Sequence, residues 1–301
     1  MQAVLVTDTA LNWGDAPDPV PTTDEVLIHV RAAGVNRADL LQARGHYPPP
    51  VGASPILGLE LAGIVDGSEE RVCALVPGGA YASLAAVHRD MLLPIPDKWS
   101  FAQGAAVPEA WLTAFVNLFC EGDLKKGESV LIHAGASGVG TAAIQLACDA
   151  GAEVFVTVRT ESKAQACRHL GAQVVPIDAL PKVDVILDCV GGSYLAANIA
   201  ALTPFGRLVN IGVLGGNKAE LDMSAVLRKR LRIIGSTLRS RPRTEHITIV
   251  KAFRERFWHK LTNGTFHIII DHTFPMQEAA AAHRYMAENR NLGKIVLVLI
   301  Q

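Results

Sequence analysis

The residues best suited to chemistry in this sequence are three glycines in one short turn, Gly135, Gly138 and Gly140. They follow an apolar run, residues 129–133, and precede a helical pattern over residues 141–150. Glycines in a strand-to-helix turn let the backbone bend tightly and let a diphosphate approach the helix N-terminus, where unpaired N–H groups and the helix dipole favour anions. The spacing departs from strict G-x-G-x-x-G, so a plain helix-start turn is the alternative. Because a strand and a helix flank the turn, we interpret it as a dinucleotide-binding turn.

Ser137 in the same turn raises a second possibility, the nucleophile elbow G-x-S-x-G of a hydrolase. That pattern requires glycine at position 139, where this chain has Val139. A serine nucleophile is therefore disfavoured.

The end of the next expected strand, residues 153–158, indicates which dinucleotide is bound. NAD sites usually have Asp or Glu there to hold the ribose 2′-hydroxyl. This chain continues with Arg159 and Thr160, and Lys163 follows three residues later. A guanidinium binds phosphate through two parallel hydrogen bonds and lysine adds a point charge, so the sequence predicts NADP(H). The alternative is a solvated surface turn with Glu161 facing the ribose.

The elements that must position this turn alternate between apolar strands and helices from about residue 110 to residue 263. Strands that are almost continuously apolar are typical of a parallel sheet covered on both faces. The expected strands are residues 129–133, 153–158, 173–177, 183–188, 207–211 and 231–237. The predicted fold class is therefore α/β, with a doubly wound parallel sheet.

The rest of the chain forms a different pattern. Residues 1–108 are expected to form short strands separated by Pro and Gly, with little helix. The tail holds an alanine-rich amphipathic helix, residues 277–288, and a final strand, residues 294–300, that does not extend the βα series. We assign this tail to the first domain and expect the site in the cleft between the domains. The predicted domains are residues 1–112 with 266–301, and residues 113–265.

Composition limits the function classes. Half of the residues are hydrophobic and 19% are charged, which indicates a compact globular protein. The formal net charge of −1 provides no general attraction for nucleic acid or an anionic membrane. Five widely spaced cysteines without a CxxC pair favour reduced, buried thiols. With no signal-peptide pattern and no apolar run near the roughly 20 residues of a membrane span, we expect a cytoplasmic protein.

Motifs along the whole chain carry a family resemblance. They are Ala33-Gly-Val-Asn-Arg-Ala-Asp-Leu40, Gly45-His-Tyr-Pro-Pro49, Leu57-Gly-Leu-Glu60, Pro108-Glu-Ala-Trp-Leu-Thr-Ala-Phe115 and Ile186-Leu-Asp-Cys-Val-Gly-Gly-Ser-Tyr194. This set resembles the zinc-independent quinone oxidoreductases of the medium-chain dehydrogenase/reductase superfamily. Pro108-Glu-Ala-Trp111, Gly191-Gly-Ser-Tyr194 and Asn291-Leu-Gly-Lys-Ile-Val296 are most similar to the tumour-suppressor-inducible quinone oxidoreductase branch.

The resemblance implies a GroES-like catalytic domain and a Rossmann domain, NADPH as hydride donor, and a homodimer formed through Rossmann edge strands. It places Asn36 and Tyr47 beside the nicotinamide and the substrate. The other cofactor contacts that it implies are Thr113 at the ring, Ala136, Ser137, Gly138, Val139 and Gly140 at the diphosphate, Arg159, Thr160, Lys163 and Tyr194 at the 2′-phosphate, Ile211, Gly212, Val213, Leu214, Ser236, Thr237 and Leu238 in strand-end loops, and Asn291 in the last segment. Residues 65–72 and 178–183 are shorter than the family's usual pattern, so the resemblance does not define the geometry of the substrate rim or the size of the substrate.

No zinc site is expected, because zinc-dependent relatives have a Cys and a His where this chain has Asn36 and Leu59, and the spacing offers no tetrahedral ligand set. Hydride transfer is the cofactor's chemistry, so the protein must orient the ring and stabilise charge on an acceptor oxygen. The Tyr47 phenol, with an ordinary pKa of about 10, can donate a hydrogen bond to that oxygen. Packing against the prolines is the alternative for Tyr47, and an Asx-type turn is the alternative for Asn36.

The resemblance thus implies an NADPH-dependent quinone oxidoreductase whose partner is a small quinone or enone. A reductase of the C=C bond in enones or enoyl thioesters is the enzymatic alternative, since the same cleft can deliver hydride to a β-carbon. The basic runs at residues 228–232 and 239–243 suggest a non-enzymatic alternative, an NADPH-binding regulator or RNA-binding protein. Such runs are more usually solvated helix ends and loops, so a nucleic-acid partner is not expected, nor is a membrane.

Overall fold

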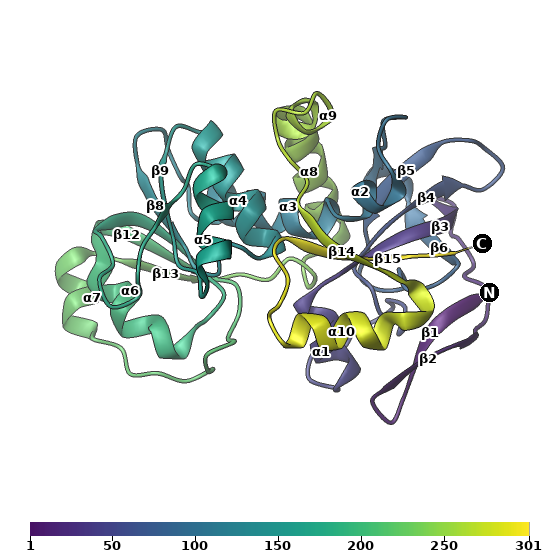
Figure 1. The fold of residues 1–301 in the computed structure, drawn as a ribbon, viewed down its shortest axis with the longest axis horizontal. Coiled ribbons are helices and arrows are strands. Elements are labelled where there is room, and N and C mark those ends of the chain that lie inside the picture. Colours follow the sequence, from purple (N-terminus) through teal and green to yellow (C-terminus); the bar gives the residue numbers. More distant parts are fainter. Residues whose placement is uncertain (301) are drawn as a thin grey trace. The chain divides into compact units, whose positions relative to one another are not determined.

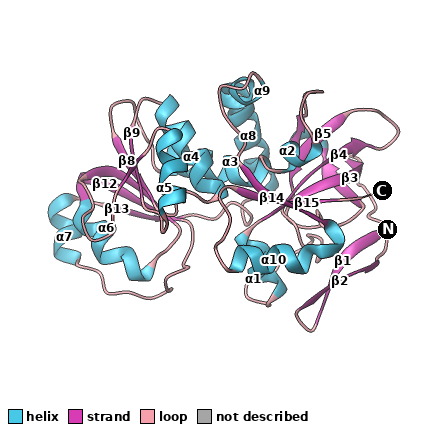
Figure 2. Cartoon of the chain, viewed as in Figure 1, coloured by secondary structure: helices cyan, strands magenta, loops and turns pink. Residues whose placement is uncertain are grey.

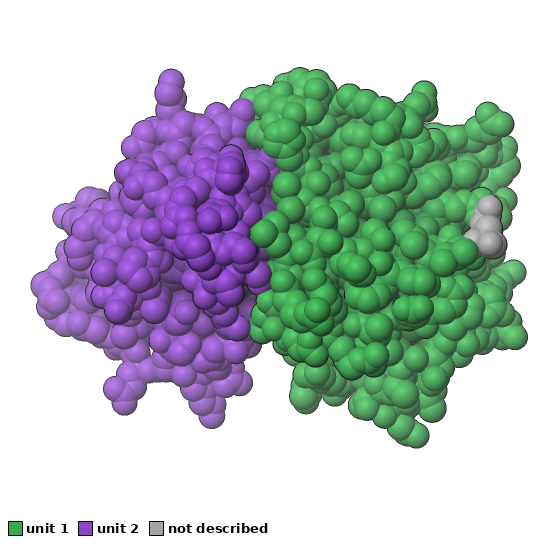
Figure 3. Space-filling model, viewed as in Figure 1, with its two compact units in different colours: residues 1–112, 239–301 green, residues 113–238 purple. Residues whose placement is uncertain are grey.

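Two compact units make up the chain, which the computed structural model describes over residues 1–300. The first unit comprises Met1–Leu112 together with Arg239–Gln301, and the second comprises Thr113–Leu238 (Figure 3). Each unit combines a β-sheet with helices (Figure 1, Figure 2).

The second unit is built around a six-stranded sheet whose neighbouring strands are all parallel. In spatial order the strands are β10 (Gln173–Val174), β9 (Glu153–Val156), β8 (Ser129–Ile132), β11 (Val183–Asp188), β12 (Leu202–Asn210) and β13 (Arg232–Gly235). Numbered within this sheet alone, the order is 3-2-1-4-5-6, the order of a doubly wound dinucleotide-binding sheet. The predicted fold class is therefore confirmed.

Helices connect and cover these strands. They are α4 (Gly138–Asp149), α5 (Glu161–His169), α6 (Leu195–Ala201) and α7 (Met223–Lys229), with a 3-10 turn, η3 (Gly192–Tyr194), before α6. Helix α4 packs on β8 and β9, whereas α6 and α7 pack on β12. A further helix, α3 (Pro108–Phe115), continues into the π-helical turn η2 (Val116–Glu121).

The central strands are buried because their sequences are almost continuously apolar. The side chains of β8 are at most 1% exposed at Val130, Leu131 and Ile132. Ile186 in β11 and Leu208 in β12 belong to the same core. A strand that is apolar on both sides needs cover on both sides of its sheet. Each such side chain stabilises the fold by roughly 1.5–3 kcal/mol relative to an exposed position.

The register of this sheet aligns the carboxyl ends of its central strands. Ile132 lies opposite Val156 and Leu187, and Val209 lies opposite Leu187 and Ile234. The residues that follow these positions therefore emerge along one edge. In doubly wound folds that edge is the one that binds ligands.

The first unit contains a mainly antiparallel sheet centred on the long strand β3 (Glu25–Val35). In spatial order its strands are β14 (Ile270–Pro275), β15 (Lys294–Val298), β3, β4 (Glu60–Val65), β5 (Arg71–Leu75) and β7 (Leu92–Pro94), with β6 (Leu84–His88) paired to the first half of β3. A separate hairpin is formed by β1 (Gln2–Thr7) and β2 (Ala10–Asp15). The last strand, β15, thus lies beside the end of β3.

The first unit also contains helices. They are α1 (Arg37–Ala43), α2 (Phe101–Ala105), α8 (Arg243–Phe253), α9 (His259–Thr262) and α10 (Ala279–Ala287), with the 3-10 turns η1 (Arg89–Met91) and η5 (Met276–Glu278) and the π-helical turn η4 (Arg254–Trp258). Helix α2 packs on β3 and β4, and α10 packs on β14 and β15. Helices α1 and α2 are too short to show a clear helical period in the sequence.

The chain returns to the first unit at Arg239, earlier than the predicted boundary before residue 266. Aromatic contacts hold the intervening segment there: the ring centroids of Trp258 and Trp99 are 5.7 Å apart, and those of Phe257 and Phe266 are 6.0 Å apart. Helix α8 also packs on η1. An amphipathic helix after a strand has the same sequence pattern as another βα repeat, so the sequence pattern alone favours the later boundary.

The cysteines differ in exposure more than the sequence suggested. Cys73 and Cys167 are buried, Cys148 and Cys189 are partly buried, and Cys120 is exposed. The expectation of a buried thiol is wrong for Cys120, which lies in η2.

Within residues 1–300, none of the helices combines the length and the apolar character needed to cross a bilayer.

Candidate functional site

The turn between β8 and α4 has the features of a diphosphate site. Ser137 caps the helix, because its Oγ accepts a hydrogen bond from the backbone N–H of Gly140 at 3.0 Å. A Cβ at Gly140 would lie 2.5 Å from the carbonyl oxygen of Gly135, and a Cβ at Gly135 would lie 2.6 Å from Cβ of Val156. The turn is therefore tight because both positions are glycine. The N-terminus of α4 supplies N–H groups and a dipole that favour an anion.

The residues predicted at the 2′-phosphate lie where β9 leads into α5. Thr160 caps α5, accepting a hydrogen bond from the backbone N–H of Lys163 at 3.4 Å. Arg159 is exposed and Lys163 is half-buried. Glu161, the acidic alternative, pairs with Arg168 at 2.7 Å. The Glu161 carboxylate, the group that would bind a ribose hydroxyl, is thus directed along the helix towards Arg168. This arrangement favours a 2′-phosphate over a ribose 2′-hydroxyl as the group bound here.

A buried polar network, which the sequence interpretation missed, lies at the ends of β8, β9, β11 and β12. His133, 2% exposed, contacts Thr157 Oγ1 through Nδ1 at 2.9 Å and Asn198 Oδ1 through Nε2 at 2.7 Å. The side-chain amides of Asn198 and Asn210 donate to Asp188 Oδ2 at 3.1 and 3.3 Å. Because the Asn198 amide nitrogen faces the carboxylate, its oxygen faces His133, so Nε2 of His133 carries the proton. Burial lowers the pKa of His133, which keeps the imidazole neutral.

This network supports residues predicted to bind the cofactor. The ring of Tyr194, in η3, meets the ring of His133 edge-on with centroids 4.9 Å apart. The loop 211–214 begins with a hydrogen bond from the Ile211 N–H to the Asp188 carbonyl at 2.7 Å, and the loop 236–238 follows β13. The predicted residues on these loops and on the glycine turn therefore follow strand ends at one edge of the sheet. Thr113 lies instead in α3, and its carbonyl accepts a hydrogen bond from the Asn117 side chain at 2.8 Å.

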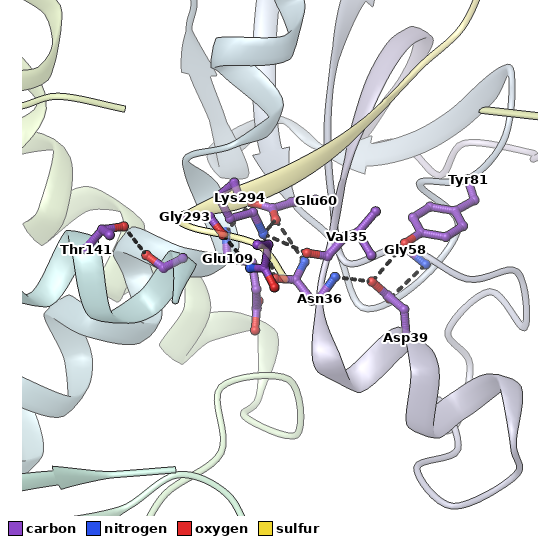
Figure 4. Close-up of polar contacts among 12 residues, drawn as sticks. Val35, Asn36, Asp39, Gly58, Glu60, Tyr81, Glu109, Thr141, Gly293 and Lys294 are labelled. Carbon is purple, nitrogen blue, oxygen red and sulfur yellow. Dashed lines mark hydrogen bonds and ion pairs between the residues drawn. The ribbon is translucent and has the colours of Figure 1, made fainter. Parts of the chain in front are cut away.

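In the first unit, Asn36 belongs to a buried ion-pair network (Figure 4). Lys294 Nζ and Glu60 Oε1 are 2.5 Å apart, and these side chains are 5% and 0% exposed. The Asn36 amide joins both: Nδ2 donates to Glu60 Oε1 at 2.8 Å, and Oδ1 accepts from Lys294 Nζ at 2.7 Å. Glu60 Oε2 accepts the backbone N–H of Glu109, at the start of α3, at 2.8 Å. The sequence interpretation named Asn36 but assigned no role to Glu60 or Lys294.

A second buried group holds the backbone at Asn36. The Asp39 carboxylate accepts the N–H of Asn36 at 2.7 Å, the N–H of Gly58 at 3.2 Å and the hydroxyl of Tyr81 at 3.1 Å (Figure 4). The Tyr81 hydroxyl also lies 3.3 Å from His283 Nε2. Burial raises the pKa of Asp39 to about 6 and lowers the pKa of His283 to about 4. At neutral pH the carboxyl is therefore ionised and the imidazole neutral.

Tyr47 lies in the turn after α1, and Arg239 holds this turn. The buried Arg239 guanidinium donates to the carbonyl oxygens of Pro77 at 2.8 Å and Tyr47 at 3.3 Å, and to Gln42 Oε1 at 2.7 Å. It lies 5.4 Å from the centre of the Tyr47 ring. Burial raises the pKa of the Tyr47 phenol, and the nearby Glu109 carboxylate adds to this effect. The phenol is therefore protonated at neutral pH and can donate a hydrogen bond.

Asn291 lies just before β15 and shapes the turn that places Lys294. Its side-chain amide donates to the carbonyl of Gly293 at 2.8 Å. Gly293 has φ 80°, and a Cβ there would lie 2.3 Å from the carbonyl oxygen of Ile269. Only glycine suits this position, so the turn fixes where β15 and Lys294 begin.

The basic runs that suggested nucleic-acid binding are largely used within the protein. Lys229 donates to three backbone carbonyls at the C-terminal end of α6 at 2.8–2.9 Å. The guanidinium of Arg230 lies 4.5 Å from the centre of the Phe205 ring, and Arg241 pairs with Glu245. These contacts favour a structural role for the two runs.

The positions that hold zinc ligands in zinc-dependent relatives do not fit a zinc ion here. Leu59, 1% exposed, has no donor atom, and the Asn36 amide is bound by Glu60 and by the Lys294 ammonium, which repels a cation. Within residues 1–300, no three side chains of His, Cys, Asp or Glu lie close enough together to hold a metal ion. A catalytic zinc site needs three such protein ligands and leaves its fourth position to water or substrate.

Comparison with known proteins agrees with this fold. The family model of the alcohol dehydrogenase GroES-like domain matches residues 22–97, and that of the zinc-binding dehydrogenases matches residues 138–255. A quinone oxidoreductase from Thermus thermophilus, solved alone and with NADPH, is 29% identical with a TM-score of 0.88, over 99% of this chain and 100% of that one. The CurK enoyl reductase is 27% identical with a TM-score of 0.84, over 99% of both chains. A mycobacterial protein complexed with NADPH is 25% identical with a TM-score of 0.88, over 99% of both chains.

Curated relatives are segments of polyketide synthases. A spectinabilin polyketide synthase protein of Streptomyces orinoci is 34% identical over 91% of this chain and 13% of its own length. A phenolphthiocerol synthesis polyketide synthase of Mycobacterium bovis is 32% identical over 91% of this chain and 14% of its own length. The chain thus spans less than a fifth of the length of the curated relatives it matches.

A parallel dinucleotide-binding sheet and a separate GroES-like unit define a nicotinamide-dependent oxidoreductase. The chain belongs to the medium-chain dehydrogenase/reductase superfamily, and its structural neighbours include quinone oxidoreductases and an enoyl reductase.

Proposed function

We propose that this oxidoreductase uses NADPH to reduce quinones or related electron-poor carbonyl compounds without zinc. The observation that carries the proposal is the Asn36 amide, held by Glu60 and Lys294 at the position where zinc-dependent relatives have a cysteine ligand. A side-chain amide offers a hydrogen-bond donor to a carbonyl oxygen where a metal ion would offer a positive charge. The similarity to the Thermus quinone oxidoreductase supports this assignment. We propose that the chain is related to the tumour-suppressor-inducible branch, which the motifs of residues 108–111, 191–194 and 291–296 resemble.

The residues proposed to hold NADPH fit its two charged groups. The capped N-terminus of α4 suits the diphosphate, and Arg159 with Lys163 suits the 2′-phosphate. When bound, NADPH supplies a hydride from its nicotinamide ring. The further proposed contacts are Thr113, residues 136–140, Thr160, Tyr194, residues 211–214, residues 236–238 and Asn291.

The chain's own contribution is to orient the substrate and stabilise charge. We assign Asn36 Nδ2 and the Tyr47 hydroxyl as donors to the acceptor oxygen, on which negative charge develops as hydride arrives. The raised pKa of Tyr47 keeps its proton on the phenol, so Tyr47 acts as a neutral donor and the final proton comes from water. Losing one such donor costs about 1–3 kcal/mol of transition-state stabilisation.

Steady-state NADPH consumption tests this function directly. The purified protein is assayed with a small quinone, an enone and an enoyl thioester, and NADH replaces NADPH as a control. The proposal expects the highest kcat/KM with NADPH and quinone, and a lower kcat/KM in Asn36→Ala with a similar NADPH Kd. Turnover that is confined to the enone or the thioester contradicts it.

Reduction of a C=C bond is the second candidate function, favoured by the CurK enoyl reductase and the polyketide synthase relatives. The same two donors would then bind the carbonyl oxygen while hydride reaches the β-carbon. NADPH labelled with deuterium at the transferred position separates the two reactions. Deuterium retained on the β-carbon of the product identifies C=C reduction.

We also propose a homodimer formed through β13, the edge strand of the parallel sheet. Ile233 in this strand is 42% exposed, and Leu227 before it is 72% exposed. An exposed edge strand with apolar side chains is a template for pairing with a second copy. Sedimentation analysis should find a dimer that Ile233→Lys dissociates, whereas a wild-type monomer contradicts the proposal.

A further inference from the structure

We infer that the Lys294–Glu60 ion pair is a positioning device that fixes the orientation of the Asn36 side-chain amide and so presents an N–H donor to the substrate. The inference rests on the proposed function, in which Asn36 contacts the acceptor oxygen. It adds Lys294 and Glu60 as residues that act through Asn36.

The orientation of an asparagine amide is decided by its partners, because its oxygen and nitrogen have nearly the same size. A lysine ammonium can only donate, and an ionised carboxylate can only accept. Asn36 Oδ1 is 2.7 Å from Lys294 Nζ, and Asn36 Nδ2 is 2.8 Å from Glu60 Oε1. A flipped amide would place two donors 2.7 Å apart and two acceptors 2.8 Å apart, so one orientation is strongly favoured.

The two charged groups are themselves held in place. The three protons of Lys294 are directed to Glu60 Oε1, Asn36 Oδ1 and the carbonyl of Val35, the last at 3.1 Å. The other oxygen of Glu60 is bound by the backbone N–H of Glu109. Neither residue can turn away from Asn36 without breaking a further bond in a buried place, and such breaks are costly.

The neighbouring backbone makes room for this arrangement. Gly34 lies on β3 next to the carboxylate, and a Cβ there would lie 2.1 Å from Glu60 Oε1 and 2.7 Å from the carbonyl oxygen of Ala105. The backbone N–H of Asn36 is fixed separately by Asp39. Both the main chain and the side chain of Asn36 are therefore set before any ligand binds, as preorganised stabilisation of charge requires.

The fixed orientation determines which ligands suit Asn36. One hydrogen of Nδ2 is bound by Glu60, and within residues 1–300 the second has no protein acceptor. That second N–H suits a carbonyl oxygen that gains negative charge. An amide does not give up its proton in water near neutral pH, so Asn36 stabilises the oxygen without protonating it.

A double-mutant cycle tests the inference. Asn36→Ala removes the donor and Lys294→Met removes the group that orients it, so each is expected to lower kcat roughly 10- to 100-fold while the NADPH Kd stays within about threefold. The kcat of the double variant is expected to lie within about threefold of the kcat of Asn36→Ala alone, because Lys294 acts through Asn36. Lys294→Arg should recover most of the activity, and Lys251→Met, which removes an exposed lysine, serves as the control.

Side-chain amide NMR of the unliganded protein provides a readout that does not depend on turnover. The Asn36 Nδ2 protons, assigned by their loss in Asn36→Ala, should give two sharp, distinct signals that shift and broaden in Lys294→Met. If Lys294→Met does not fold, Glu60→Gln, which keeps the volume and removes the charge, should broaden the same signals. Unchanged signals, or losses of activity that multiply in the double variant, overturn the inference. A fixed amide in a protein that reduces neither quinones nor enones refutes the proposed function and leaves the positioning role standing.

Discussion

Replacing Arg159 and Lys163 by alanine is expected to remove most of the preference for NADPH over NADH. These side chains flank the junction of β9 and α5, where Thr160 caps the helix and Glu161 is paired with Arg168. The double variant leaves the glycine turn and the His133 network intact. It therefore changes the phosphate contacts without altering the rest of the proposed cofactor site.

The expected magnitude follows from the exposure of the two cations. A hydrogen bond to a charged group contributes about 1.5–3 kcal/mol, and exposure places Arg159 at the lower end of that range because solvent and salt screen it. About 3 kcal/mol for the pair corresponds to roughly a 100-fold rise in the NADPH Kd. NADH lacks the 2′-phosphate, so its Kd should change less than about threefold.

Fluorescence titration of both cofactors at low and high salt measures this effect. Lys182→Ala/Arg228→Ala is the matched control, since it removes the same charge elsewhere: Lys182 directly precedes β11, and Arg228 lies in α7, the helix that precedes β13. The control should keep the wild-type ratio of NADH to NADPH affinities. If Arg159→Ala/Lys163→Ala also keeps that ratio, the phosphate assignment is wrong.

Three further predictions follow from the other sites. Tyr47→Phe should lower kcat/KM roughly 10- to 100-fold with little change in NADPH Kd, and unchanged turnover with both quinone and enone would show that the hydroxyl is not catalytic. Activity should survive exhaustive chelation, because Asn36 and Leu59 supply neither thiolate nor imidazole, and a loss that zinc restores would contradict the account. The buried His283 has a pKa of about 4, below the unfolded value of about 6.5, so its stabilising contribution is present above pH 6.5 and is lost as the pH falls towards 4. Urea unfolding at pH 7 and 4.5 should show that the wild type loses on the order of 2–3 kcal/mol more than His283→Gln, and equal losses would refute this.

Local patterns in the sequence were sufficient to predict the parallel sheet and the glycine turn. The expected strand 183–188 is β11 with the same bounds, and the helix expected over residues 141–150 corresponds to α4, Gly138–Asp149. The strand is indicated by a continuous apolar run and the helix start by turn glycines. Each of these patterns spans only a few neighbouring residues. The strand expected over residues 173–177 ends at Val174 in β10, shortly before Pro176, which has no N–H to donate to a ladder.

Contacts between distant residues could not be predicted in the same way. Glu60 and Lys294 are 234 positions apart, and nothing near either residue indicates that they form a buried ion pair around Asn36. His133 and Asn198 likewise meet only because α6 packs beside the strand ends. A polar residue at the end of an apolar strand was the available signal for His133 and for Asp188. The difference between the expected boundary at residue 266 and the return of the chain at Arg239 has a related cause, since the helical period of α8 does not reveal which unit its apolar face packs against.

The proposed function depends on the transfer of hydride from NADPH to a quinone without a metal ion. A single-turnover measurement tests it most directly: protein freed of metal by chelation, with its metal content determined, is loaded with NADPH and mixed with a quinone. We expect one NADPH to be oxidised per site, more slowly when deuterium occupies the transferred position, at a rate independent of residual zinc. Bound NADPH that is not oxidised, or a rate that follows the zinc content, would rule out metal-independent quinone reduction.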